Sequence, residues 1–210
     1  METIINLIDH WQTLVGAILG GLFALGVALL VAHQARRREE VSAATLLVGN
    51  LVSVQASHSA LFAQADKEMV HGDALSRWIA EMLVRSRPKL SVLFEPSMVR
   101  VMPLCTKLSA HLSLFHTIYA DVNHHLDRLE ADFEEARLTG KLSRSKDALN
   151  VDAKLAHEGF EIAAEHARCA ERLLNHVVLS KLPMWHRMKR VIWPSKDERK
   201  CKRLLKKGSI

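Results

Sequence analysis

Acidic and histidine side chains recur at helical spacing in two segments, where such groups could hold a metal ion. Asp121, His124 and His125 fall within about one turn of each other if this part of the chain is helical. A second segment carries a similar set: His157, Glu161, Glu165 and His166. Bundle sites for two iron ions require Glu-x-x-His on each of two helices, which this chain does not supply. We therefore expect polar helix faces and no metal, and keep Asp121, His124 and His125 only as weak candidate ligands.

The remaining histidines and the cysteines offer little chemistry at the level of sequence. His58 and His111 border apolar stripes, so we expect hydrogen-bonded residues at the edge of the core rather than ligands. Cys105, Cys169 and Cys201 are far apart, odd in number and without a Cys-x-x-Cys pair. In a reducing compartment this pattern predicts free thiols, and it argues against a disulfide framework or a zinc site.

Motifs for catalysis are absent from the sequence. No Gly-x-Ser-x-Gly elbow provides a nucleophile, and no Gly-x-Gly-x-x-Gly or P-loop pattern provides a phosphate cradle. We therefore predict that the chain is not an enzyme and that it uses no cofactor.

The C-terminal segment, residues 183–210, combines bases with large apolar side chains. Residues 181–210 hold eleven basic and two acidic residues, a net +9, whereas the whole chain is only +6. The residues expected to touch an anionic membrane surface here are Trp185, Arg187, Lys189, Arg190 and Trp193. Each base near such a surface contributes about 1 kcal/mol. The alternatives are tryptophans that cap the domain above a solvated tail, and nucleic acid, for which there is no base-reading motif.

A long apolar run lies near the N-terminus, before all of these groups. Residues 14–32 hold nineteen uncharged, mostly apolar side chains. About 20 such residues cross a bilayer as a helix. The run predicts a transmembrane helix over residues 14–35, preceded by a short extracytoplasmic stretch, residues 1–13. A cleaved signal peptide is the weaker interpretation, because the leader has no basic residue and the run is long.

The arginines beside the run predict its direction. Arg36, Arg37 and Arg38 follow it, and no Lys or Arg precedes it. Because cytoplasmic flanks carry the excess of basic residues, we expect the N-terminus outside and the rest in the cytoplasm. A bacterial inner membrane is the expected location, and these arginines are expected to lie against its anionic inner leaflet.

Small residues recur every four positions along the run and could form an association face. The members of this ladder are Gly16, Gly20, Ala24, Ala28 and Ala32. Small residues at this spacing let two membrane helices approach closely. The ladder predicts a homo-oligomer or a partner membrane protein, although Gly and Ala are also common in membrane helices in general.

Residues 36–182 read as one cytoplasmic domain of helices. Apolar periodicity predicts helices over residues 39–71, 74–85, 108–136 and 148–181, with a connection at 86–97. Met69 is expected on the apolar stripe of the first helix, Pro103 is expected to break a helix that starts near residue 97, and Thr139-Gly140 is expected to stop the third helix. In the last helix the expected buried side includes Leu155, Phe160, Ile162 and Ala163. Such stripes can be buried only against each other, so the fold class is all-α: one transmembrane helix, then an antiparallel helical bundle.

Three functions fit this organisation. The first is a membrane-anchored adaptor, accessory or regulatory protein that acts by binding proteins and the membrane surface. The second is a pore-forming or lysis-type oligomer controlled by the cytoplasmic bundle. The third is a bundle that senses a ligand or a metal.

Overall fold

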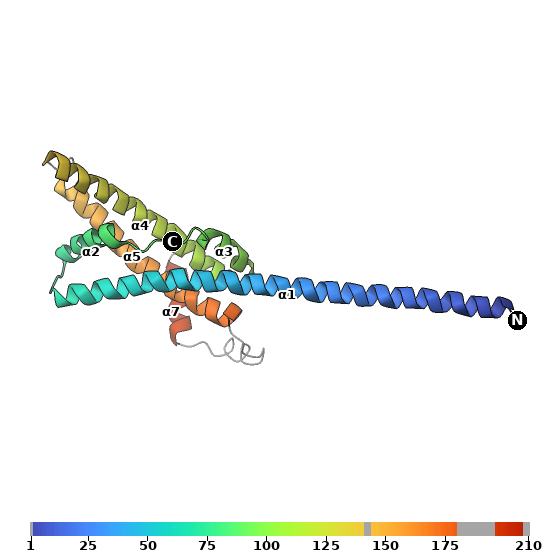
Figure 1. The fold of residues 1–210 in the computed structure, drawn as a ribbon. Helices are drawn as coiled ribbons and strands as arrows, with labels where there is room; N and C mark the ends of the chain where they lie inside the picture. The colour runs from blue at the N-terminus through green and yellow to red at the C-terminus, as the bar shows by residue number, and fades with distance from the viewer. Residues whose placement is uncertain (1, 141–143, 180–195, 208–210) are drawn as a thin grey trace. The chain divides into compact units, whose positions relative to one another are not determined.

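A computed structural model describes residues 2–140, 144–179 and 196–207, and every regular element among them is helical (Figure 1). The α-helices are α1 (Glu2–Lys67), α2 (Asp73–Ser86), α3 (Phe94–Val101), α4 (Thr106–Thr139), α5 (Lys146–Leu174) and α7 (Lys196–Lys207). Two short elements accompany them: the 3-10 turn η1 (Met102–Leu104) and the π-helical turn η2 (Asn175–Leu179). The all-helical class is thus confirmed, as is a long apolar helix at the N-terminus.

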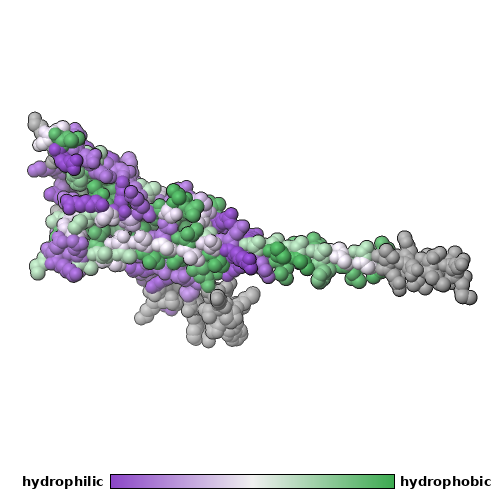
Figure 2. Space-filling model, in the orientation of Figure 1, coloured by the Kyte–Doolittle hydropathy of each residue, from purple (hydrophilic) through white to green (hydrophobic). Residues whose placement is uncertain are grey.

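The chain divides into two compact units, Met1–Ser42 and Ala43–Ile210. The first unit consists of the N-terminal part of α1, whose apolar side chains are exposed; Phe23 is 76% exposed. The hydrophobic surface of this stretch is visible in Figure 2. Among the described residues, α1 is the one helix long and apolar enough to cross a membrane.

The second unit has a core, to which α1 contributes one stripe. Leu47, Leu51 and Val54 are fully buried, as expected from their spacing of three and four. The helix ends at Lys67, so Met69, which the periodicity also placed on the stripe, lies beyond it and is exposed. Burying one such Leu or Val side chain contributes roughly 1.5–3 kcal/mol.

The most extensive packing in this unit joins α4 and α5. Contacts pair His111 with His166 and His125 with Asp152, so the two helices run in opposite directions. The predicted stripe on α4 is buried from Leu108 to Leu129.

The packed face of α5 matches the predicted one only in part: Phe160 and Ala163 are buried as expected. Leu155 and Ile162 are exposed, whereas α4 packs on a face made largely of alanines. Small side chains on α5 let the large side chains of α4 come close, so alanine, and not leucine, marks the interface here. The buried alanines are Ala153, Ala156, Ala163, Ala164, Ala167 and Ala170.

Local signals explain where α4 stops and α5 starts. Gly140 has a φ of 69° and ends α4 in the left-handed conformation, with its N–H donating to Ala136 O at 2.9 Å. Ser145 caps α5 by accepting from the N–H of Ala148 at 3.2 Å. The predicted stop at Thr139-Gly140 is therefore confirmed.

The connection expected at residues 86–97 is only partly correct, because α3 begins inside it at Phe94. The prolines suggested a break, yet Pro96 lies in the first turn of α3, where proline is tolerated. Pro103 lies in η1, and this 3-10 turn separates α3 from α4 as the proline predicted.

Candidate functional site

The small-residue ladder lies on the exposed surface of α1. Gly16, Gly20, Ala24, Ala28 and Ala32 are all exposed, and a Cβ added at Gly16 or Gly20 would meet no atom within 4 Å. The ladder is thus sterically open to another helix, and association through it stays a prediction.

Of the arginines after the apolar run, Arg36 is exposed and Arg37 is half-buried, and both are paired with an acid on the same helix. Arg36 Nε lies 3.1 Å from Glu40 Oε1, and Arg37 Nη1 lies 3.7 Å from Glu40 Oε2. Arg38 is exposed as well. Exposed pairs of this kind contribute little to stability. Contact of these arginines with an anionic membrane surface stays a prediction.

The five residues predicted to touch the membrane surface near the C-terminus lie outside the described residues. These are Trp185, Arg187, Lys189, Arg190 and Trp193. From the same predicted segment, α7 is described: a twelve-residue helix that carries seven of its bases.

The weak metal candidates are not assembled into a site. His125 Nδ1 lies 2.9 Å from Asp152 Oδ1, and its Nε2 lies 3.8 Å from Asp121 Oδ2. His124 is exposed. Because carboxylates face both nitrogens of His125, this residue belongs to an ion-pair network and not to a ligand set.

The centre of that network is the buried carboxyl of Asp152, which α5 presents to α4. Arg144 bridges two acids, with Nη2 2.6 Å from Asp152 Oδ2 and Nη1 2.8 Å from Asp132 Oδ2. Burial alone would raise the pKa of Asp152. Hydrogen bonds from Arg144 and His125, with the charge of Arg128, outweigh burial and lower that pKa. The network is satisfied internally and fastens the start of α5 to α4.

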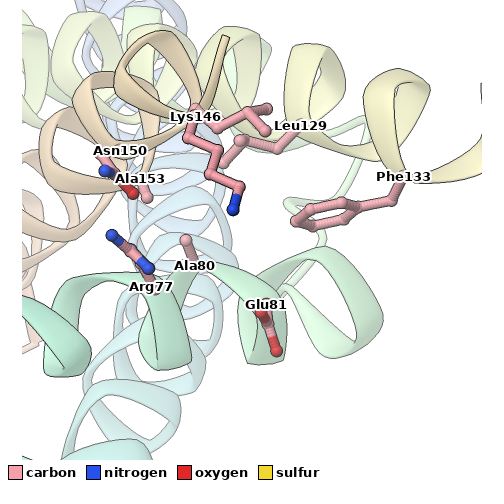
Figure 3. A pocket seen from close by; sticks show the side chains of 9 residues that line it. Arg77, Ala80, Glu81, Leu129, Phe133, Lys146, Asn150 and Ala153 are labelled. Atoms are coloured by element: carbon pink, nitrogen blue, oxygen red, sulfur yellow. The ribbon is translucent and has the colours of Figure 1, made fainter. Parts of the chain in front are cut away.

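An open pocket of about 250 Å³ lies between α2, α4 and α5 (Figure 3). Leu129 and Phe133 form an apolar side, and the Lys146 ammonium points into the space between the helices. Arg77 and Glu81 of α2 line the opposite side. The pocket is shallow and mixed in charge, so it does not select a ligand class.

A second, largely buried group of histidine and cysteine side chains joins α4, α5 and α7. Potential ligand atoms of His111, Cys169 and Cys201 all lie within 4.8 Å of one another, and His111 and Cys169 are buried. The Nδ1 atoms of His111 and His166 lie 3.0 Å apart. Among the described residues, this group brings three potential metal ligands together.

The cysteines differ from the sequence prediction of three free thiols. Cys105 is free, but Cys169 is disulfide-bonded to Cys201. The two cysteines are 32 positions apart in the sequence, so no local spacing indicated the pairing, and the packing of α7 on α5 brings them together. An ion pair of 2.8 Å between Lys200 Nζ and Glu165 Oε1 lies beside the link.

Both histidines of this group are held in the neutral form. Burial lowers the pKa of His111 to about 4, with a further contribution from His166. Burial also lowers the pKa of His166, and Glu165 opposes this shift. In the Nδ1–Nδ1 contact one ring donates an N–H and the other accepts it, so the two rings hold different tautomers.

Sequence reasoning missed this group, although one signal was present. His166-x-x-Cys169 places an imidazole and a thiol on one face of a helix. The partners on α4 and α7 carry no spacing rule, because they come from distant helices. His111 was expected at the edge of the core, and it is in fact only 1% exposed.

No protein-family model matches the chain, and no curated protein or solved structure is similar to it.

Proposed function

We propose that this chain is a single-pass membrane protein whose cytoplasmic helical bundle acts by binding a protein partner and the inner leaflet, and not by catalysis. The observation that carries the proposal is the exposed apolar surface of α1 between Leu14 and Val31. Eleven Leu, Ile, Val or Phe side chains lie in this stretch, with no charge among them.

Energetics favour a bilayer as the environment of this surface. At the centre of a membrane helix each of these side chains contributes about −0.3 to −0.6 kcal/mol, so eleven of them contribute roughly −3 to −7 kcal/mol. A contiguous exposed surface made of eleven large apolar side chains is rare on soluble proteins. The same side chains in water would favour aggregation.

A binding role is supported by the outer face of α5. Val151, Leu155 and Ile162 recur at steps of four and seven, and they are 44–55% exposed. This apolar stripe lies on a helix whose other face is buried against α4 and α2. A protein partner that covers this stripe would gain free energy by burying its apolar side chains.

A crosslinking experiment tests the proposal in cells. A photo-crosslinking amino acid is placed at Leu155, with Glu134 on the exposed side of α4 as the matched control position. We expect a discrete crosslinked product in the membrane fraction from position 155 and none from position 134. Mass spectrometry of the product identifies a second copy of the chain or a partner protein.

Two results would overturn the proposal. The first is recovery of the chain in the soluble fraction after cell lysis, which would remove the anchor. The second is dye leakage from vesicles that contain the purified chain, which would favour the pore-forming alternative. We prefer the binding role because residues 14–32 contain no polar side chain that could line a channel.

A further inference from the structure

Three helices converge on one small buried volume, each with a side chain that metals prefer. His111 comes from α4, Cys169 from α5 and Cys201 from α7, and their ligand atoms lie within 4.8 Å of one another. His166, one turn before Cys169, lies beside His111 and is also buried. We propose that this His–Cys cluster (His111, His166, Cys169 and Cys201) binds a zinc-type divalent cation when the two cysteines are reduced.

The donor set fits the chemistry of zinc. Two thiolates and two neutral imidazoles form one of the ligand sets found in structural zinc sites, at Zn–S of about 2.3 Å and Zn–N of about 2.0–2.1 Å. Carboxylate and carbonyl oxygens would instead favour calcium or magnesium, and thiolates select against both. A zinc-type ion is therefore the expected occupant.

The distance between the two histidines is close to that of such a site. Two nitrogen ligands at 2.0–2.1 Å from a tetrahedral ion lie about 3.3–3.4 Å apart. The Nδ1 atoms of His111 and His166 lie 3.0 Å apart, so an ion fits between them after a small movement of the rings. The ring that donates in this contact then carries its proton on Nε2, and both imidazoles stay neutral. The two sulfur atoms must separate to about 3.8 Å, which requires the Cys169–Cys201 bond to be broken.

Reduction of the disulfide supplies the ligands. A cytosolic dithiol transfers two electrons and two protons to the Cys169–Cys201 bond, which gives two thiols, and the dithiol itself becomes a disulfide. Binding of the dication then releases the two thiol protons and leaves two thiolates on the metal. The disulfide and the metal site are therefore mutually exclusive states of the same pair.

The test is a cobalt titration of the full-length protein in detergent, after reduction and removal of the reductant. Co²⁺ reports the site because thiolate ligation gives a charge-transfer absorption and tetrahedral geometry gives visible ligand-field bands. We expect both signals to saturate at one equivalent and to be displaced by Zn²⁺. Protein with the Cys169–Cys201 disulfide formed should give neither signal.

Matched variants assign the ligands. C169S, C201S and H111A are each expected to lose the charge-transfer signal or the tetrahedral bands, and H166A is expected to weaken binding. C105S removes the cysteine outside the cluster, and H124A removes an exposed histidine of α4, so both should bind as the parent does. Circular dichroism checks that each variant keeps its helices.

Several outcomes would overturn the inference. They are an absent cobalt signal in protein whose thiols are titrated as free, equal binding by the oxidised protein, and unchanged binding in C169S or C201S. The comparison of oxidised with reduced parent protein needs no substitution, so it decides the matter even if a variant fails to fold. Binding in detergent does not depend on which side of a membrane the domain faces, so the inference and the proposed function can fail separately.

Discussion

Gly159 shows how one hydrogen atom in place of a side chain sets the distance between α4 and α5. A Cβ at this position would lie 2.7 Å from Cγ2 of Val122, a stiff and buried side chain. Alanine normally stabilises a helix by about 1 kcal/mol relative to glycine, but overpacking a core costs about 1–3 kcal/mol. We expect Gly159→Ala to lower the free energy of unfolding by about 1 kcal/mol in urea denaturation of the detergent-solubilised protein.

Gly49 provides the control for this prediction. It lies within α1, is exposed, and has no atom within 4 Å of an added Cβ. Gly49→Ala should therefore raise the free energy of unfolding by up to about 1 kcal/mol. If both alanine variants were stabilised, the close approach of Gly159 to Val122 would not affect the free energy of unfolding.

Two histidines near the aromatic part of the core predict a pH dependence. His58 and His157 each hold a buried Nε2 with no hydrogen-bond partner among the described residues. Burial is the main cause that lowers both pKa values, and Glu161 opposes it. The unfolded chain then takes up protons below about pH 6.5 that the folded chain does not. Stability is complete above that pH, and it falls as the pH drops towards the folded pKa values.

We therefore expect the urea midpoint to decrease between about pH 7.5 and 5.5, and His58→Leu to make this decrease smaller. The comparison isolates His58, because the other buried histidines are the same in both proteins. An unchanged pH slope in the variant would show that His58 is protonated equally well in the folded and unfolded states.

At the residue scale, periodicity predicted burial well only where large side chains alternate with polar ones. The stripe of α4 was predictable for this reason, since large apolar side chains such as Leu112 and Phe115 are stable only when they are buried in the core. The face of α5 was predicted only in part, since Phe160 is buried as expected but alanine fits both a surface and a tight interface. The His–Cys cluster was hidden for a different reason: no local rule connects His111 with Cys201.

At the scale of elements, α1 carries the ladder that we expect to mediate association. Gly20→Ile together with Ala24→Ile would add branched side chains to an open face of the helix, since a Cβ built at Gly20 has no neighbouring atom within 4 Å. Such bulk keeps two helix backbones apart and weakens association, so we expect the oligomer in detergent to dissociate at a higher protein concentration than the parent does. Analytical ultracentrifugation measures this change.

The matched control places the same side chain elsewhere on α1. Leu22 and Leu29 lie roughly opposite Gly20 and Ala24 around the helix, and both are exposed. Leu22→Ile together with Leu29→Ile should leave the oligomer unchanged. Equal effects from both pairs, or none from either, would remove the ladder from the account of assembly.

Elements were predictable where their ends carry a chemical signal. Gly140 and Ser145 mark the ends of α4 and α5, and the predicted stop at residue 140 is correct. The start of α3 was missed because Leu93 at its N-cap makes no side-chain hydrogen bond and Pro96 resembles a breaker. Helices without capping side chains depend on packing, which sequence alone does not display.

At the scale of the whole molecule, the direction of insertion is the property to test. Three arginines follow the apolar run and none precedes it, so a fluorescent protein fused to the C-terminus should fluoresce and a fused alkaline phosphatase should be inactive. Replacing Arg36, Arg37 and Arg38 by Gln, with Lys placed at Thr3 and Asn6, should invert a fraction of the molecules.

Acidic neighbours offer the control for this inversion. Replacing Glu39 and Glu40 by Gln changes the local charge by a similar amount, but acids contribute little to orientation. The phosphatase fusion of this variant should stay inactive. An active phosphatase in the parent chain would place the C-terminal domain outside the cytoplasm.

The link between Cys169 and Cys201 also determines how firmly α7 is held. Seven of the twelve residues of α7 are bases, and an isolated helix of this length is marginal in water. The helix is therefore stabilised by two contacts with α5, which are the disulfide and the Lys200–Glu165 ion pair. Backbone amides of α7 would then exchange with deuterium slowly while Cys201 is tied to the domain and quickly when it is released. The exchange rate of α7 would therefore report whether Cys169 and Cys201 are linked.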